Sequence, residues 1–137
     1  MQRVLGRYAE YTYAILRIVT GFLFLLHGTQ KLFAIPPSAQ GGGGPLNTLM
    51  LVGAIIEMVG GVLIMIGFFS SFAAFIASGE MAVAYFMFHQ PRAGLPTTNG
   101  GDAAVLFCFL FLYIASRGSG VWSVDSLVRN PTPIAST

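Results

Sequence analysis

The sequence contains little charge and has no basic cluster. Only 9% of its 137 residues are charged, compared with about 25% in soluble domains. A chain with so few charged side chains cannot cover a water-exposed surface, so a soluble globular domain is excluded. The formal net charge is +2, but the basic residues are scattered along the chain. This distribution gives no support for a nucleic-acid partner.

Cysteine is also scarce. The single cysteine, Cys108, lies in the apolar run 105–110, so neither an intramolecular disulfide nor a CxxC redox pair can form. We expect Cys108 to be a packing residue, since its neighbours supply no base. The sequence also lacks iron–sulfur cysteines and a convincing pair of haem ligands. The chain therefore cannot run a complete electron-transfer reaction alone.

Apolar residues, in contrast, are abundant. They make up 55% of the chain, and the mean hydropathy is +0.74. Because about 20 residues cross the hydrocarbon layer as a helix, the long apolar runs predict an all-α membrane protein. We expect helices at about 11–33, 46–68, 72–88 and 102–116. Joined by short turns, they predict a bundle of four antiparallel transmembrane helices in contact with the lipid bilayer.

The ends of the chain are predicted to lie outside this bundle. Residues 1–10 are expected to form a cytoplasmic segment, 11–127 the membrane domain and 128–137 a disordered tail. The first apolar run is too long for a signal peptide, and no small-residue cleavage site follows it. Loop 35–45, with three prolines and four glycines, interrupts the helical pattern. The first run is therefore read as a retained span.

Basic residues near the ends of the helices predict the orientation. Four of them lie on the side of both termini and two on the other: Arg3, Arg7, Arg117 and Arg129 against Lys31 and Arg92. Basic residues favour the cytoplasmic side. We expect a multi-pass protein of a bacterial or archaeal cytoplasmic membrane, with both termini in the cytoplasm.

Three ionisable residues fall inside the apolar runs. Arg17 lies in the first expected helix, Glu57 in the second and Glu80 in the third, all at compatible depths. A charge near the bilayer centre costs about 2.5–3.5 kcal/mol, so such groups usually have partners in the bundle. We predict that Arg17 bridges Glu57 and Glu80. Two acids and one base leave a negative charge over, so this network either binds a proton or serves only as glue between helices.

A second polar group is expected near the side opposite the termini. His27 and Lys31 are one helical turn apart, and His89 and Asp102 flank the third loop. Two histidines without HxxxH or CxxC spacing are a weak signal for a metal, and we predict none. A quinone is the better candidate ligand, because its carbonyls accept hydrogen bonds from His or Lys. Histidines that are merely satisfied within the bundle are the alternative.

Glycines are frequent in the second expected helix. Gly53, Gly60, Gly61 and Gly67 have the spacing of small residues that let transmembrane helices approach closely. We interpret them as packing residues.

A set of motifs in fixed order resembles a known family. These motifs are Arg17 with Gly21, HGTQKL at 27–32, EMVGG at 57–61, NGGD at 99–102 and WSVD at 122–125. Together they are similar to the DoxX family of small four-helix membrane proteins, over about 17–127. The third loop of the family more often reads Asn-Gly-Gly-Glu, so Asp102 keeps the charge with a shorter reach.

The resemblance implies a role in quinone-linked respiratory or sulfur redox chemistry. The family takes its name from a subunit of a quinone-linked thiosulfate-oxidising or terminal oxidase system. It implies at most one subunit of a membrane oxidoreductase, acting as a homo-oligomer or within a larger complex. A non-enzymatic anchoring or assembly subunit is the alternative. A small-solute or proton transporter is a third, which would need oligomerisation to form a pathway.

Overall fold

The computed structural model describes residues 4–38 and 44–129. Residues 130–137 of the predicted tail, residues 1–3 and three of the loop glycines lie outside the described residues. The described part contains helices and no strand. The all-α prediction is therefore confirmed for this part of the chain.

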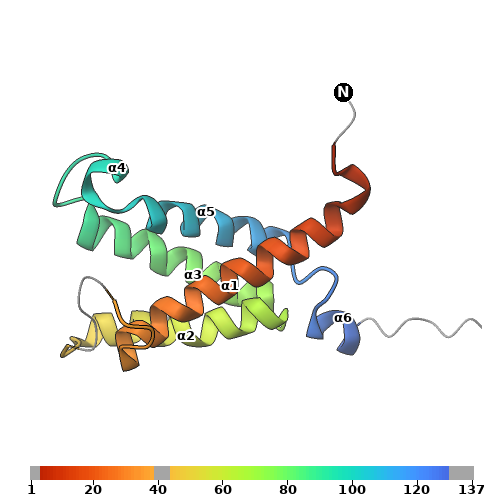
Figure 1. The fold of residues 1–137 in the computed structure, drawn as a ribbon, viewed down its shortest axis with the longest axis horizontal. Helices are drawn as coiled ribbons and strands as arrows, with labels where there is room; N and C mark the ends of the chain where they lie inside the picture. The colour runs from red at the N-terminus through yellow and green to blue at the C-terminus, as the bar shows by residue number, and fades with distance from the viewer. Residues whose placement is uncertain (1–3, 39–43, 130–137) are drawn as a thin grey trace, which may run out of the picture.

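Four long helices make up most of the molecule (Figure 1). They are α1 (Ala9–Phe33), α2 (Thr48–Ile66), α3 (Ser70–Ala84) and α5 (Asp102–Arg117). A 3₁₀ turn (Gly6–Tyr8) precedes α1, and a π-helical turn, η2 (Tyr85–His89), extends α3. Two short helices, α4 (Pro96–Asn99) and α6 (Val124–Val128), lie in the connections at either end of α5.

Helix α2 has an identifiable signal at each end. The side chain of Asn47 accepts a hydrogen bond from the backbone N–H of Met50, which caps the N-terminus. Gly67 ends the helix in the left-handed conformation, with φ of 74°, a position at which glycine carries no steric penalty. Helix α3 begins only three residues later, so α2 and α3 form an antiparallel pair.

Within residues 4–38 and 44–129, three segments are long and apolar enough to cross a membrane. They are Gly6–Phe33, Thr48–Ile66 and Ser70–His89. Helix α5 has 16 residues, fewer than the 20 or so that usually span the hydrocarbon. The structure thus confirms a membrane protein with three candidate spans, and the four-span bundle stays a prediction.

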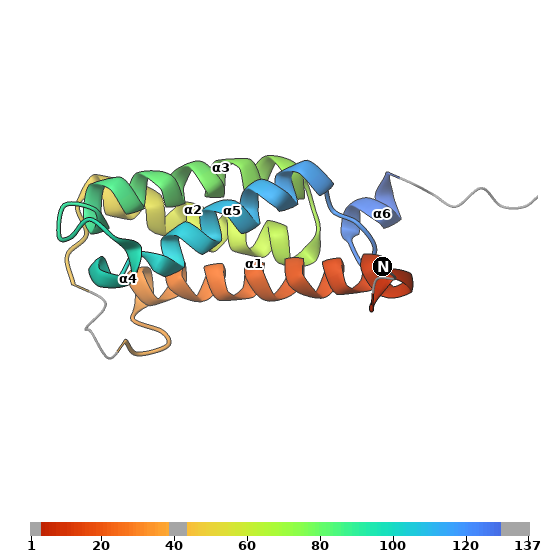
Figure 2. The ribbon, with the colours of Figure 1, turned by 90° about the horizontal axis from the view of Figure 1, so that it is seen from above.

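The long helices pack in two pairs that run between two ends of the molecule (Figure 1). Helix α1 packs along α2, and α3 packs along α5. In both views the first described residues and α6 lie at one end of the molecule, which we call the terminal end (Figures 1 and 2). Segments 34–38 and 90–101 lie at the other, which we call the loop end. Fully buried Phe24, Phe111 and Ile64 fill the space between the helices.

Backbones of α1 and α2 touch along a seam of small residues. A Cβ atom built on Gly28 would lie 2.5 Å from the backbone nitrogen of Met58, and one built on Gly61 would lie 2.5 Å from that of Leu25. No side chain fits such a gap. Gly61 is therefore a packing residue, as predicted. This contact also fixes the register of the two helices, with Gly28 beside the turn that carries Glu57.

Candidate functional site

An ion pair at the loop half of the bundle joins α1 to α2. The ammonium of Lys31 donates to Oε1 of Glu57 over 2.6 Å. Glu57 is almost completely buried, whereas the Lys31 side chain is 38% exposed. Lysine can reach so deep because its four-carbon stem packs along apolar surface while its charge meets the carboxylate. The sequence placed these residues in two separate groups, and the structure brings them together.

Glu80 adds a second carboxyl group to this pair. It projects from α3 toward α2, where a Cβ on Gly53 would lie 3.0 Å from its Oε1. Gly53 therefore leaves the room that the Glu80 carboxyl occupies. The charges that act on Glu80 come from Glu57 and Lys31. We call Lys31, Glu57 and Glu80 the carboxyl cluster.

The carboxyl cluster has more acid than it has partners. Oε2 of Glu57 and Oε2 of Glu80 are both buried and have no hydrogen-bond partner. Two carboxylates beside one ammonium would leave one buried negative charge uncompensated, and burying such a charge is costly. In such a site one carboxyl group usually binds a proton and becomes neutral. The arrangement is thus suited to hold and release a proton.

His27 lies beside the carboxyl cluster on the surface of the bundle. It is exposed, it acts electrostatically on Glu57, and its neighbour Gly28 packs at the depth of Glu57. Nδ1 lies 2.8 Å from the carbonyl oxygen of Leu23. Because a carbonyl can only accept, Nδ1 carries the proton and Nε2 of the neutral ring is left as an acceptor. The edge of the ring meets Phe107 of α5, with centroids 5.6 Å apart.

His89 and Asp102 do not join this group. Nδ1 of His89 lies 3.3 Å from the carbonyl oxygen of Asn99, and its ring stacks on Tyr85. Asp102 is exposed in the first turn of α5. Over 4–38 and 44–129, no three His, Cys, Asp or Glu side chains are grouped to hold a metal ion. His27 and Lys31 thus lie at the carboxyl cluster, whereas His89 and Asp102 lie apart from it, at the two ends of the third loop.

Arg17 has different partners from those predicted. Its Nη1 donates to the carbonyls of Ile64 and Met65 over 2.7 and 2.8 Å. Its Nη2 donates to the carbonyls of Val121 and Trp122 over 3.3 and 2.7 Å. The prediction that Arg17 bridges Glu57 and Glu80 is therefore wrong. Arg17 is fully buried, and it stabilises the C-terminal end of α2, where unpaired carbonyls and the helix dipole favour a cation.

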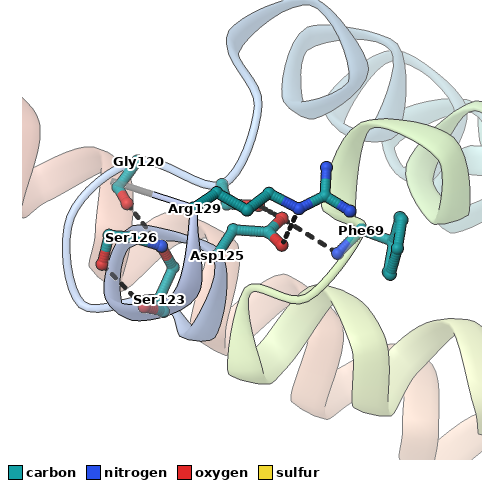
Figure 3. Close-up of polar contacts among 7 residues, drawn as sticks. Phe69, Gly120, Ser123, Asp125, Ser126 and Arg129 are labelled. Carbon is teal, nitrogen blue, oxygen red and sulfur yellow. Dashed lines mark hydrogen bonds and ion pairs between the residues drawn. The ribbon is translucent and has the colours of Figure 1, made fainter. Parts of the chain in front are cut away.

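The segment after α5 closes the terminal end around Arg17. The carboxylate of Asp125 accepts a hydrogen bond from the backbone N–H of Phe69 over 2.9 Å (Figure 3). It also forms an ion pair with Arg129, with Nε and Oδ1 3.3 Å apart. Ser123 caps α6 by accepting from the N–H of Ser126. The carboxylate of Asp125 thereby ties α6 to the turn between α2 and α3.

Sequence reasoning assigned no role to Gly28 or Asp125, and it interpreted Gly53 as a packing residue without linking it to the Glu80 carboxyl. Gly21 and Gly28 in α1 are seven residues apart, and so are Ala54 and Gly61 in α2. This matching spacing was the available sequence signal for the seam. The pattern becomes apparent only when the sequences of the two helices are compared. Asp125 carried no such signal, because its partner is a backbone N–H 56 residues away.

The comparison with known families agrees with this architecture. Residues 12–90, more than half of the chain, match the family model named DoxX. The chain belongs to the DoxX family. With its apolar helices, it is a membrane protein of the DoxX type. The match includes Arg17 and all three residues of the carboxyl cluster.

A relative from Haemophilus influenzae extends the DoxX match. This protein, described as uncharacterized, is 43% identical over 126 residues, which cover 89% of this chain and 94% of the relative. No solved structure matches the chain.

Proposed function

We propose that this DoxX protein is a membrane subunit of a quinone-linked respiratory or sulfur oxidoreductase, in which His27 binds a quinol and the carboxyl cluster takes up its protons. One observation carries the proposal: an exposed histidine with a free acceptor nitrogen lies at the depth of two carboxyl groups, each with a buried oxygen that has no partner, of which only Glu57 is paired with an ammonium. The resemblance described above, rather than the relative, suggests the redox setting.

The chemistry assigned to the chain is binding and proton transfer. A quinol that becomes a quinone releases two protons and two electrons. Nε2 of His27 accepts a hydrogen bond from a quinol hydroxyl, and the ring of Phe107 offers an apolar face to the quinol. A proton that passes to His27 finds a buried carboxylate nearby. The electrons go to a redox-active partner subunit that holds a haem or an iron–sulfur cluster.

The proposed setting is a bacterial or archaeal cytoplasmic membrane with both termini in the cytoplasm. The basic residues of the sequence favour this orientation. Both ends of the described chain lie at one end of the bundle (Figure 1), an arrangement compatible with it. The protein would act as a homo-oligomer or within a larger membrane complex.

Photolabelling tests the quinol site. The purified protein, in lipid nanodiscs, is treated with a photoreactive quinone analogue, and the labelled peptides are mapped by mass spectrometry. We expect label on α1 or α5 near His27, competed by added quinol. Because a lost polar contact of 1.4 kcal/mol lowers affinity tenfold, His27→Ala should reduce labelling by about tenfold.

A matched control variant separates this site from general labelling of membrane histidines. His89→Ala removes a histidine from the same half of the bundle, where the ring is held by Asn99, and should leave the labelling unchanged. Equal losses in both variants, or label confined to helices away from His27, would contradict the proposal.

A hollow at the terminal end favours a second candidate, an anchoring subunit. It measures about 670 Å³, and its lining includes Phe72, Trp122, Ser119 and Arg129. Mixed polar and aromatic surfaces of this kind occur at protein interfaces. If Phe72→Ala and Trp122→Ala release the chain from its native complex while His27→Ala alters nothing, anchoring is the better account.

A further inference from the structure

We infer that the carboxyl cluster exchanges protons only with the aqueous phase at the loop end of the bundle. This inference rests on the proposed function and adds a direction to it: protons taken from a quinol leave on the side opposite the termini. With the termini in the cytoplasm, that side is the outside of the cell.

The route toward the loop end passes along Lys31. This residue lies two positions before the end of α1, so its partly exposed stem reaches from the membrane surface to Glu57. Among the described residues, the titratable groups that act on Glu57 are Lys31 and His27 of α1, and those that act on Glu80 are Glu57 and Lys31. Helix α5 contributes none of them. The titratable groups that act on these two carboxyl groups therefore all lie on α1 or α2.

The route toward the terminal end is filled by apolar side chains. The ring of Phe24 lies 3.8 Å from the Cβ position of Gly60, one helical turn from Glu57. Phe24, Ile64 and Phe111 are at most 1% exposed. Packing of this density leaves no room for a chain of waters.

Buried polar side chains on the terminal side of the cluster include Ser78, Arg17 and Ser70, and the hydroxyl of Ser70 and Nε of Arg17 have no hydrogen-bond partner. Ser78 donates its hydroxyl to the carbonyl of Cys108 over 2.8 Å. Arg17, further toward the terminal end, places its guanidinium among four carbonyls and, as a permanent cation, repels an approaching proton. The terminal side of the bundle is thus closed to the cluster both by packing and by charge.

Carbodiimide labelling in vesicles of one orientation tests the inference. Dicyclohexylcarbodiimide dissolves in lipid and modifies protonated carboxyl groups, so its own entry does not depend on the side of addition. Full-length protein with a C-terminal tag is reconstituted, and vesicles with the tag outside are captured. The terminal end then faces the external buffer and the loop end faces the lumen. The pH of each compartment is varied separately, with an entrapped dye to verify the gradient.

We expect modification of Glu57 or Glu80 to follow the pH of the lumen alone. Labelling should fall by up to about tenfold for each unit of lumenal pH, since the protonated fraction of a carboxyl changes by that factor above its midpoint. External pH should have no effect. Labelling that follows external pH, follows both compartments equally or is absent at every pH would overturn the inference.

Variants at Lys31 sharpen the result. Lys31→Met removes the cation that keeps one carboxyl ionised, so labelling should be high and independent of pH. Lys31→Arg restores a cation and should restore the response to lumenal pH.

Quinone photolabelling of the same vesicles separates the direction of proton exchange from the quinol function. Intact labelling near His27 with a response to external pH refutes only the direction, whereas lost photolabelling with a lumenal response refutes only the quinol function.

Discussion

Buried charged side chains have different kinds of partners at the two ends of the bundle. At the terminal end, the guanidinium of Arg17 donates to four backbone carbonyls, two at the end of α2 and two in the segment between α5 and α6. At the loop end, the ammonium of Lys31 pairs with Glu57 and acts on Glu80 only through its charge, and each carboxyl group retains a buried oxygen without a hydrogen-bond partner. Both Nη atoms of Arg17 are hydrogen-bonded without any ligand, and only its Nε is left without a partner. The carboxyl cluster becomes complete only when something is bound, and a proton is the simplest candidate.

The largest effect is expected from removing the cation at the terminal end. Arg17→Gln leaves several buried carbonyls without a charged donor, and it should lower the free energy of unfolding by about 3 kcal/mol or more. Unfolding in mixed detergent micelles, followed by circular dichroism, measures the change. Arg117→Gln is the control, because Arg117 pairs with Glu10 on the surface and its removal should leave the midpoint unchanged. Equal destabilisation by both variants would refute the special role of Arg17.

The partners of Arg17 also show where sequence reasoning fails. Hydropathy located the long helices because the bilayer imposes their length and apolar content, and depth along the helices placed Glu57 and Glu80 at similar levels. Depth alone does not reveal lateral neighbours. It paired Arg17 with carboxylates, whereas the register set by Gly28 places Arg17 beside the end of α2. Carbonyls carry no sequence signal, so a cation held by backbone is hard to predict.

Lys31 illustrates the opposite error. Its position near the end of a helix suggested a group at the surface, and its distance from Glu57 in sequence gave no hint of contact. The length of its side chain allows the ammonium to enter the apolar layer. The prediction of two separate polar groups was therefore too simple for α1, although it remains apt for His89, which stays with its own loop.

A second large effect should come from the seam that aligns the two ends. Gly28→Ala places a Cβ 2.5 Å from the backbone of Met58, and overpacking of this kind costs about 1–3 kcal/mol. It should also separate Lys31 from Glu57. Gly79→Ala is the matched control: nothing lies within 4 Å of its Cβ position, and alanine should stabilise this helical site by up to about 1 kcal/mol. The same micelle unfolding assay serves both variants, and a stable Gly28→Ala protein would contradict the seam.

Removing the cation at the loop end should cost much less than removing Arg17. Lys31→Met leaves Glu57 without its partner, but this carboxyl can take up a proton instead of remaining a buried anion. We expect a loss of about 1 kcal/mol and, in infrared spectra at neutral pH, a second protonated carboxyl band. Lys31→Arg should keep a single band. An unchanged spectrum in Lys31→Met would show that the ammonium does not control the charge of the cluster.

The smallest effect on stability is expected at Glu80. If its carboxyl is the one that carries the proton, glutamine has nearly the same shape and charge, so Glu80→Gln should change the free energy of unfolding by less than about 1 kcal/mol. It should nevertheless remove the protonated carboxyl band and its response to pH. Asp102→Asn, an exposed site at the loop end, should leave that band intact. A large loss of stability in Glu80→Gln would instead mean that Glu80 is held as an anion, and the contrast between a closed terminal end and an unsatisfied loop end would fail.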